Sequence, residues 1–188
     1  MTIRLEGIWD KGFAFDLHSV SSTYLGVNEY GRDQFHTVRT PMGELVHSLK
    51  YKSNKGAVIE IVNLLTSKIH GFETFDAIVP CPPTNSRTWQ PVEEIAKELG
   101  NRFQVKFINA LKKEAGQTQV KDIDPAERER ILSESIKLNG NFDFSDQKIL
   151  LIDDLYQSGS TLSASTSVLK IQGRAKTVYV LAMTKTRG

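Results

Sequence analysis

Short apolar segments of strand length alternate with segments of helical character through the second half of the chain. The apolar segments are residues 76–80, 105–109, 148–153 and 177–183, and helix patterns or caps mark residues 92–99, 124–132 and 161–172 between them. A strand, a helix and a second strand in succession form a right-handed unit whose strands are parallel. The sequence therefore predicts an α/β fold, with a parallel sheet flanked by helices on both faces.

The first part of the chain has a different character. Residues 1–20 read as a β-hairpin, and residues 21–39 lack a clear period and read as a loop with short strands. Thr40 and Pro41 have the pattern of an N-cap followed by proline at the first helical position, and a second helix is expected around residues 58–69. We therefore expect a small β-rich appendage over residues 1–40 and an α/β core over residues 41–188.

Composition excludes several classes of protein. A net charge of +2 over 188 residues provides no overall field for nucleic acid or membrane, and one cysteine excludes an internal disulfide framework. No segment approaches the roughly 18 apolar residues that span a bilayer. We expect a cytoplasmic protein.

One βα turn combines two opposite chemical properties. Asp153 and Asp154 follow the apolar run 149–152, and Gln157, Ser158, Gly159, Ser160 and Thr161 then lead into a helix. The carboxyl ends of parallel strands are where ligands bind, and a helix N-terminus favours an anion. A ribose 5-phosphate satisfies both, because its hydroxyls donate to carboxylates while its phosphate accepts from the turn. Routine helix capping is the simpler reading of the same residues.

Segment 149–162 resembles the phosphoribosyl pyrophosphate motif of type I phosphoribosyltransferases, with Ser158 where threonine is common. Residues 43–52, 78–100, 118–132 and 180–186 are similar to segments of the ComF-like branch of that family, which is associated with DNA uptake. The amino-terminal zinc ribbon of many ComF-like proteins is missing. The resemblance implies the fold predicted above, with residues 1–40 as a hood.

The resemblance also implies roles for individual residues. Pro82 and Arg87 belong to the expected pyrophosphate loop, and residues 112–122 read as a lid in which Lys112 binds substrate and Lys113 assists catalysis. Asp153 and Asp154 would be catalytic through the ribose, residues 157–161 would bind substrate, and Mg²⁺ would arrive bound to phosphoribosyl pyrophosphate rather than to protein ligands.

The implied reaction transfers ribose 5-phosphate between phosphoribosyl pyrophosphate and a nitrogenous base. Two alternatives stay open: a non-catalytic sensor of phosphoribosyl pyrophosphate or nucleotides, and an accessory protein of DNA uptake. The expected partners are phosphoribosyl pyrophosphate and a nucleobase-like acceptor, and a homodimer is open. We expect no membrane partner, and no DNA binding without a further protein.

Overall fold

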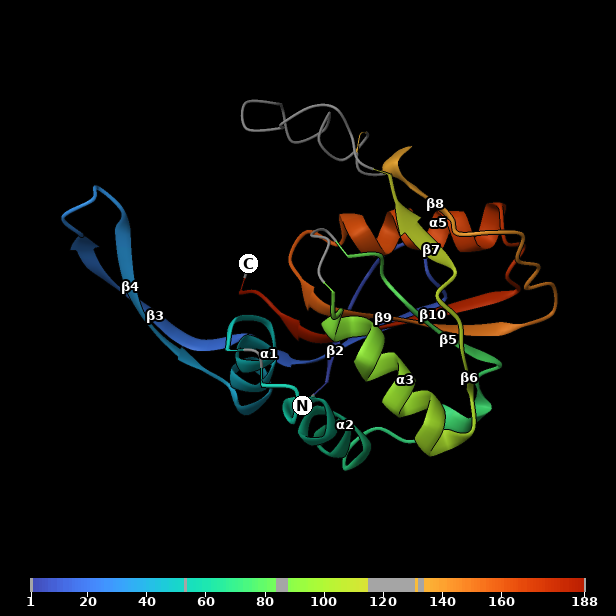
Figure 1. The fold of residues 1–188 in the computed structure, drawn as a ribbon, viewed down its shortest axis with the longest axis horizontal. Coiled ribbons are helices and arrows are strands. Elements are labelled where there is room, and N and C mark those ends of the chain that lie inside the picture. The colour runs from blue at the N-terminus through green and yellow to red at the C-terminus, as the bar shows by residue number, and fades with distance from the viewer. Residues whose placement is uncertain (1, 53, 84–87, 115–130, 132–133, 188) are drawn as a thin grey trace.

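The computed structural model describes residues 2–52, 54–83, 88–114, 131 and 134–187. Its central sheet has six strands in the order β1-β2-β10-β9-β5-β6, and two further two-stranded sheets are formed by β3 with β4 and by β7 with β8 (Figure 1). The strands are β1 (Ile3–Arg4), β2 (Lys11–Leu17), β3 (Ser19–Val27), β4 (Asp33–Arg39), β5 (Ala77–Pro80), β6 (Lys106–Phe107), β7 (Leu111–Lys113), β8 (Ile136–Leu138), β9 (Lys148–Tyr156) and β10 (Thr177–Lys185). The helices are α1 (Pro41–Tyr51), α2 (Ala57–Thr66), α3 (Pro91–Phe103), α5 (Ser160–Ile171) and the 3₁₀ turn η1 (Phe72–Thr74).

The central sheet is mostly parallel. β2, β10, β9, β5 and β6 pair in parallel, and only the edge strand β1 runs antiparallel to its neighbour. The predicted α/β fold with a β-rich amino-terminal region is therefore confirmed.

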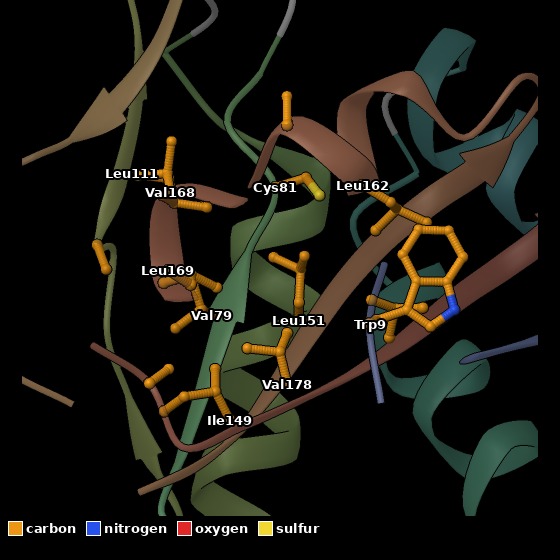
Figure 2. Packing of buried hydrophobic residues seen from close by; sticks show 14 of the residues in the cluster. Trp9, Val79, Cys81, Leu111, Ile149, Leu151, Leu162, Val168, Leu169 and Val178 are labelled. Carbon is orange, nitrogen blue, oxygen red and sulfur yellow. The ribbon is translucent and has the colours of Figure 1, made fainter. Parts of the chain in front are cut away.

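The side chains of β9 show that the sheet is covered on both faces. Ile149 and Leu151 point into a core shared with α5, whereas Leu150 and Ile152 point into a core shared with α1, α2 and α3. Figure 2 shows Ile149 and Leu151 packed with residues of α5 and with Trp9 in the first core. Because successive side chains alternate between faces, a continuous apolar run is what a doubly covered strand requires.

Helix α1 begins as the sequence predicts. The Thr40 hydroxyl accepts a hydrogen bond from the Gly43 backbone N–H at 3.0 Å, and Pro41 is the first helical residue. The same hydroxyl donates to the Leu17 carbonyl at 2.6 Å, which ties the helix start to the end of β2. This cap fixes where α1 lies relative to the carboxyl edge of the sheet.

Residues 21–39, expected to be a loop with short strands, are more regular than the sequence predicts, and β3 begins two residues earlier, at Ser19. They form a hairpin of two long strands, β3 and β4, that projects from the body beside α1 (Figure 1). β1 and β2, by contrast, join the central sheet. Residues 1–40 thus contribute to two structures, and their separation from residues 41–188 as a functional unit stays a proposal.

The predicted helix over residues 124–132 lies almost wholly outside the described residues. Among the helices that the structure describes, none has the length and apolar character needed to cross a membrane.

Candidate functional site

A cavity of about 230 Å³ opens at the carboxyl ends of β5 and β9. The segment after β5, the start of α3, the end of β9, the first turn of α5 and one residue of α1 surround it. Its lining consists of Lys50, Cys81, Pro82, Pro83, Gln90, Pro91, Val92, Glu93, Asp153, Asp154, Leu155 and Thr161. Within the described part of the chain, residues 2–40 contribute nothing to this lining. The cavity therefore lies where ligands bind in parallel α/β sheets.

The two aspartates face this cavity because the neighbouring strand is shorter. β5 ends at Pro80, opposite Ile152, whereas β9 continues to Tyr156. The Asp154 backbone N–H donates to Asp153 Oδ1 at 2.9 Å. Burial, followed by the neighbouring charge of Asp154, raises the pKa of the Asp153 carboxyl well above its usual value. Perturbed carboxyl groups in a cavity are typical of functional sites.

Lys50 supplies a positive charge to this acidic pair. Its Nζ lies 2.7 Å from Asp154 Oδ2, and both side chains are largely shielded from solvent. Lys50 was not among the predicted site residues, because its partner Asp154 follows more than a hundred residues later in the sequence.

The turn after β9 has the conformation that the anion prediction needs. Gly159 has φ of 82°, and a Cβ there would lie 2.8 Å from Tyr156 Cε2, so the position favours glycine. The Ser158 and Ser160 hydroxyls lie 2.9 Å apart, and α5 begins at Ser160. The first turn of a helix presents backbone N–H groups without intrahelical partners. Gln157 and Ser158 are exposed, so the turn is accessible to an anion.

The expected pyrophosphate loop is described only in part. Pro82 is buried and lines the cavity, whereas Arg87 lies outside the described residues. Gln90 and Glu93, which sequence reasoning missed, line the cavity from the start of α3. Asn109 Nδ2 donates to Glu93 Oε1 at 3.2 Å. Their only signal in the sequence was the position after a proline-rich segment.

Lys112 and Lys113 lie in β7, at the start of the segment expected to form a lid. Burial lowers the pKa of Lys113, and Lys112 Nζ lies 3.7 Å from Glu114 Oε1. Neither lysine belongs to the cavity lining. Residues 115–122 lie outside the described residues, so the lid and both lysine assignments stay predictions.

The carboxylates of the cavity fit a hard cation that arrives with its own phosphate ligands. Asp153, Asp154 and Glu93 are oxygen donors of the kind that Mg²⁺ prefers, and Mg²⁺ commonly uses one or two carboxylates plus substrate phosphates. Among the described residues, no group of three or more His, Cys, Asp or Glu side chains is placed to hold a metal ion alone.

Comparison with known families identifies the class that this fold and site define. The phosphoribosyl transferase domain matches residues 47–186, so the chain belongs to that family. The match runs from the second half of α1 to the end of β10 and includes every strand that lines the cavity.

Solved structures with a similar chain path carry names from the same class. Adenine phosphoribosyltransferase from Thermoanaerobacter pseudethanolicus is 15% identical, with 87% of this chain and 95% of that chain covered and a TM-score of 0.45. Adenine phosphoribosyltransferase from Leishmania tarentolae is 10% identical over 98% of this chain and 95% of that chain, with a TM-score of 0.46. Orotate phosphoribosyltransferase from Aeropyrum pernix is 12% identical over 84% of this chain and 73% of that chain, with a TM-score of 0.43. A search among curated proteins finds no match.

Proposed function

We propose that the chain is a cytoplasmic phosphoribosyltransferase that binds phosphoribosyl pyrophosphate and transfers ribose 5-phosphate to or from a nitrogenous base. The proposal is supported by one observation above all: the Gly159 turn follows directly on the strand that carries Asp153 and Asp154. Asp153, Asp154 and, from the first turn of α5, Thr161 line a single small cavity, and few ligands other than a phosphorylated sugar need both carboxylates and a helix N-terminus.

In this proposal the two aspartates accept hydrogen bonds from the ribose hydroxyls, and residues 158–161 hold the 5′-phosphate through backbone N–H groups and hydroxyls. The bond from C1 to the pyrophosphate oxygen breaks as the bond from C1 to the base nitrogen forms. Positive charge develops on the ribose, and the nearby carboxylates stabilise it. Positioning and electrostatics then account for most of the rate, without a covalent intermediate on the protein.

Lys50 keeps the acidic pair stable when no ligand is bound. Two adjacent carboxyl groups in a shielded cavity repel each other when both are charged, and the ion pair with Lys50 offsets part of that cost. An ionised carboxylate has lone pairs for several donors, so Asp154 can accept a ribose hydroxyl while the lysine remains in contact.

Mg²⁺ bound to the pyrophosphate would neutralise the charge that accumulates on the leaving group. The phosphates of the ligand would hold the ion, and one or two of the cavity carboxylates Asp153, Asp154 and Glu93 would complete its ligands, directly or through water. Lys112, Lys113 and Arg87 are proposed to contact the pyrophosphate. Pro82 would shape the backbone that faces it.

The ComF-like branch is the finer part of the proposal. It is supported by residues 43–52, 78–100, 118–132 and 180–186, which resemble segments of that branch. The same cavity would equally serve a sensor that binds phosphoribosyl pyrophosphate without turnover, because a fold and a ligand site do not by themselves establish catalysis.

Two measurements test the proposal. Isothermal calorimetry measures binding of phosphoribosyl pyrophosphate with Mg²⁺, and a pyrophosphate-release assay follows turnover with adenine, guanine, hypoxanthine, uracil and orotate. We expect binding and release with one acceptor class, and loss of both in a variant that carries Asp153→Asn and Asp154→Asn. Binding without release for any base would favour the sensor. Failure of the folded protein to bind phosphoribosyl pyrophosphate would refute the proposal.

A further inference from the structure

A second cavity, of about 440 Å³, lies at the amino ends of the central strands. β2, β10 and β9 begin at Lys11, Thr177 and Lys148 and run parallel, so their starts share one edge of the sheet. The cavity with Asp153 and Asp154, called here the first cavity, opens at the other edge. At about 3.3 Å per residue along β9, Lys148 and Asp153 are roughly 17 Å apart. The second cavity is therefore separate from the proposed ribose site.

The second cavity exists because the helices cover only part of this face of the sheet. Phe13 and Phe15 lie on the same face of β2, since side chains alternate along a strand. Phe15 is 2% exposed in the core with α1, α2 and α3, whereas Phe13 is 39% exposed. Leu150 and Leu181 line the cavity from β9 and β10, and segment 68–75, which follows α2, lines it as well. The amino ends of the strands thus provide a partly uncovered apolar floor.

Aromatic rings form much of the lining. They belong to Phe13 and Tyr179 of the sheet and to Phe72 and Phe75 of segment 68–75. Phe75 and Tyr179 form an edge-to-face pair whose ring centroids lie 5.5 Å apart. Aromatic rings attract one another beyond the burial of their area, so this lining favours a ligand with a planar ring.

The charged side chains of the second cavity all have the same sign. Lys11, Lys68 and Lys148 line it, and no acidic residue of the described chain does. Lys11 Nζ and Lys148 Nζ lie 5.4 Å and 4.8 Å from the centroid of the same Tyr179 ring. Within the described residues, none of the three lysines forms an ion pair. Like charges that share one ring without a carboxylate favour an anion between them.

The contacts that these lysines do make leave their charge available. Lys148 Nζ donates to Thr74 Oγ1 at 2.9 Å and lies 4.4 Å from the centroid of the Phe75 ring. A ring face attracts an ammonium group but carries no net charge to neutralise it. Asp76 Oδ2 accepts from the Lys148 backbone N–H at 2.7 Å, and Asp10, next to Lys11 in the chain, pairs with another lysine, Lys170, at 2.9 Å.

We propose that the second cavity binds a small molecule that joins a planar aromatic ring to an anionic group. The ring packs on the apolar floor around Phe13, and the anion faces Lys11 and Lys148. Small-molecule sites of about 300–1,000 Å³ have this combination of apolar walls and a few polar groups. Nucleotides and aromatic carboxylates both carry the required chemistry. The proposal does not rest on the activity of the first cavity, because no residue lines both cavities.

Equilibrium dialysis of the full chain with 1-naphthyl phosphate tests the proposal, because this probe has the ring and the anion but no ribose. We expect a dissociation constant of about 1 mM or tighter, which a ligand of this size reaches at ordinary efficiency. Neutral 1-naphthol and inorganic phosphate each carry half of the chemistry and should bind at least about tenfold more weakly.

Variants locate the probe. Lys148→Met keeps the apolar stem against the rings and removes the charge, and it should weaken binding roughly tenfold. Lys176→Met is the matched control: it removes the same charge just before β10, from a side chain that is 65% exposed and outside the cavity lining. It should bind the probe as the unmodified chain does. Phe13→Thr keeps a strand-forming residue, removes the ring and should weaken binding about fivefold. Circular dichroism and thermal melts verify the fold of each variant.

A variant with Asp153→Asn and Asp154→Asn separates the two cavities. It should bind 1-naphthyl phosphate as tightly as the unmodified chain, even though binding of phosphoribosyl pyrophosphate is expected to be lost. Competition in this variant identifies the natural source: displacement by adenosine 5′-monophosphate indicates a nucleotide, and displacement by indole-3-acetate an aromatic carboxylate.

Four results would overturn the proposal. They are absence of binding up to about 10 mM probe, equal losses in Lys148→Met and Lys176→Met, binding of 1-naphthol as tight as that of its phosphate, and displacement by neither competitor. Loss of the probe in the aspartate variant would place it in the first cavity and so overturn the proposal too. Failure to bind phosphoribosyl pyrophosphate would refute the proposed function alone.

Discussion

Lys50 Nζ and Asp154 Oδ2 are 2.7 Å apart and join the end of α1 to the end of β9. The two side chains are 25% and 13% exposed, so their attraction is less screened than that of a surface pair. The contact links α1, the helix that follows the hairpin of β3 and β4, to the acidic pair of the cavity.

Replacement of Lys50 by methionine should lower the free energy of unfolding by about 1–3 kcal/mol, because it leaves a shielded carboxylate without its charged partner. Chemical denaturation at neutral pH measures the change. Lys52→Met is a matched control on the same helix end: Lys52 pairs with Glu44 at 2.8 Å, with both side chains at least half exposed. Such surface pairs contribute about 0–1 kcal/mol. Equal losses in both variants would contradict the shielding argument.

Replacement of Asp153 by asparagine should stabilise the protein at high pH while it weakens binding of phosphoribosyl pyrophosphate. Burial and the charge of Asp154 raise the folded-state pKa of Asp153 above the unfolded value, which is about 3.9. A raised pKa means that the stability this carboxyl contributes below about pH 4 is lost as pH rises through the folded-state pKa.

The variant should therefore match the unmodified protein near pH 4 and gain about 0.5–2 kcal/mol in free energy of unfolding near pH 9, the usual range for a single stabilising substitution. Denaturation series at several pH values, with calorimetry for the ligand, provide the test. A stability difference that does not change with pH would show that the Asp153 carboxyl is not the group responsible.

Replacement of Gly159 by alanine should cost roughly 1–3 kcal/mol of stability, because a non-glycine residue at positive φ is strained and the new Cβ meets Tyr156. The displaced turn should also lower affinity for phosphoribosyl pyrophosphate by about tenfold, or roughly 1.4 kcal/mol. Gly140→Ala is the control, since Gly140 has φ of 132° but its nearest neighbour would be Phe142 at 3.5 Å, outside the cavity lining. It should lose stability and keep its affinity. Unchanged ligand affinity in the Gly159 variant would remove the turn from the phosphate site.

Stability should decrease as pH falls below about 6.5, the ordinary value for histidine, with His18 among the groups responsible. Burial, followed by the positive charges of Arg39, Lys50 and His47, lowers the pKa of His18. A lowered folded-state pKa means that stability present above pH 6.5 is lost as pH falls through the folded-state value. His18→Gln should flatten this slope in thermal melts relative to the unmodified chain. An unchanged slope in this variant would rule out His18.

The sequence predicted the sheet because the core leaves a clear local pattern. A run such as Ile149–Ile152 is apolar at every position only when both faces of its strand are covered, as the two cores of the structure confirm. Thr40 and Pro41 predicted the start of α1 for an equally local reason, since a cap acts within one helical turn.

The hairpin of β3 and β4 and the role of Lys50 were not predictable in the same way. Alternation reveals a strand only when one of its faces is buried, and no residue of β3 or β4 is buried. The partner of Lys50 lies on a distant strand, and no spacing rule connects a helix end to a residue after β9. Asp153 and Asp154 were identified because their charges end an apolar run. Gln90 and Glu93 lie at the start of an amphipathic helix, where polar residues are ordinary.

The chain has one thiol, Cys81, and it lies buried in the wall of the cavity. Burial, and then the negative charge of Asp153, raises its pKa well above that of a free cysteine. Because only the thiolate reacts with alkylating reagents, the native protein should be labelled slowly, and each labelling event reports a local opening of the wall. The rate at which Cys81 is labelled, with and without ligand, therefore measures how often the cavity wall opens beside the two aspartates.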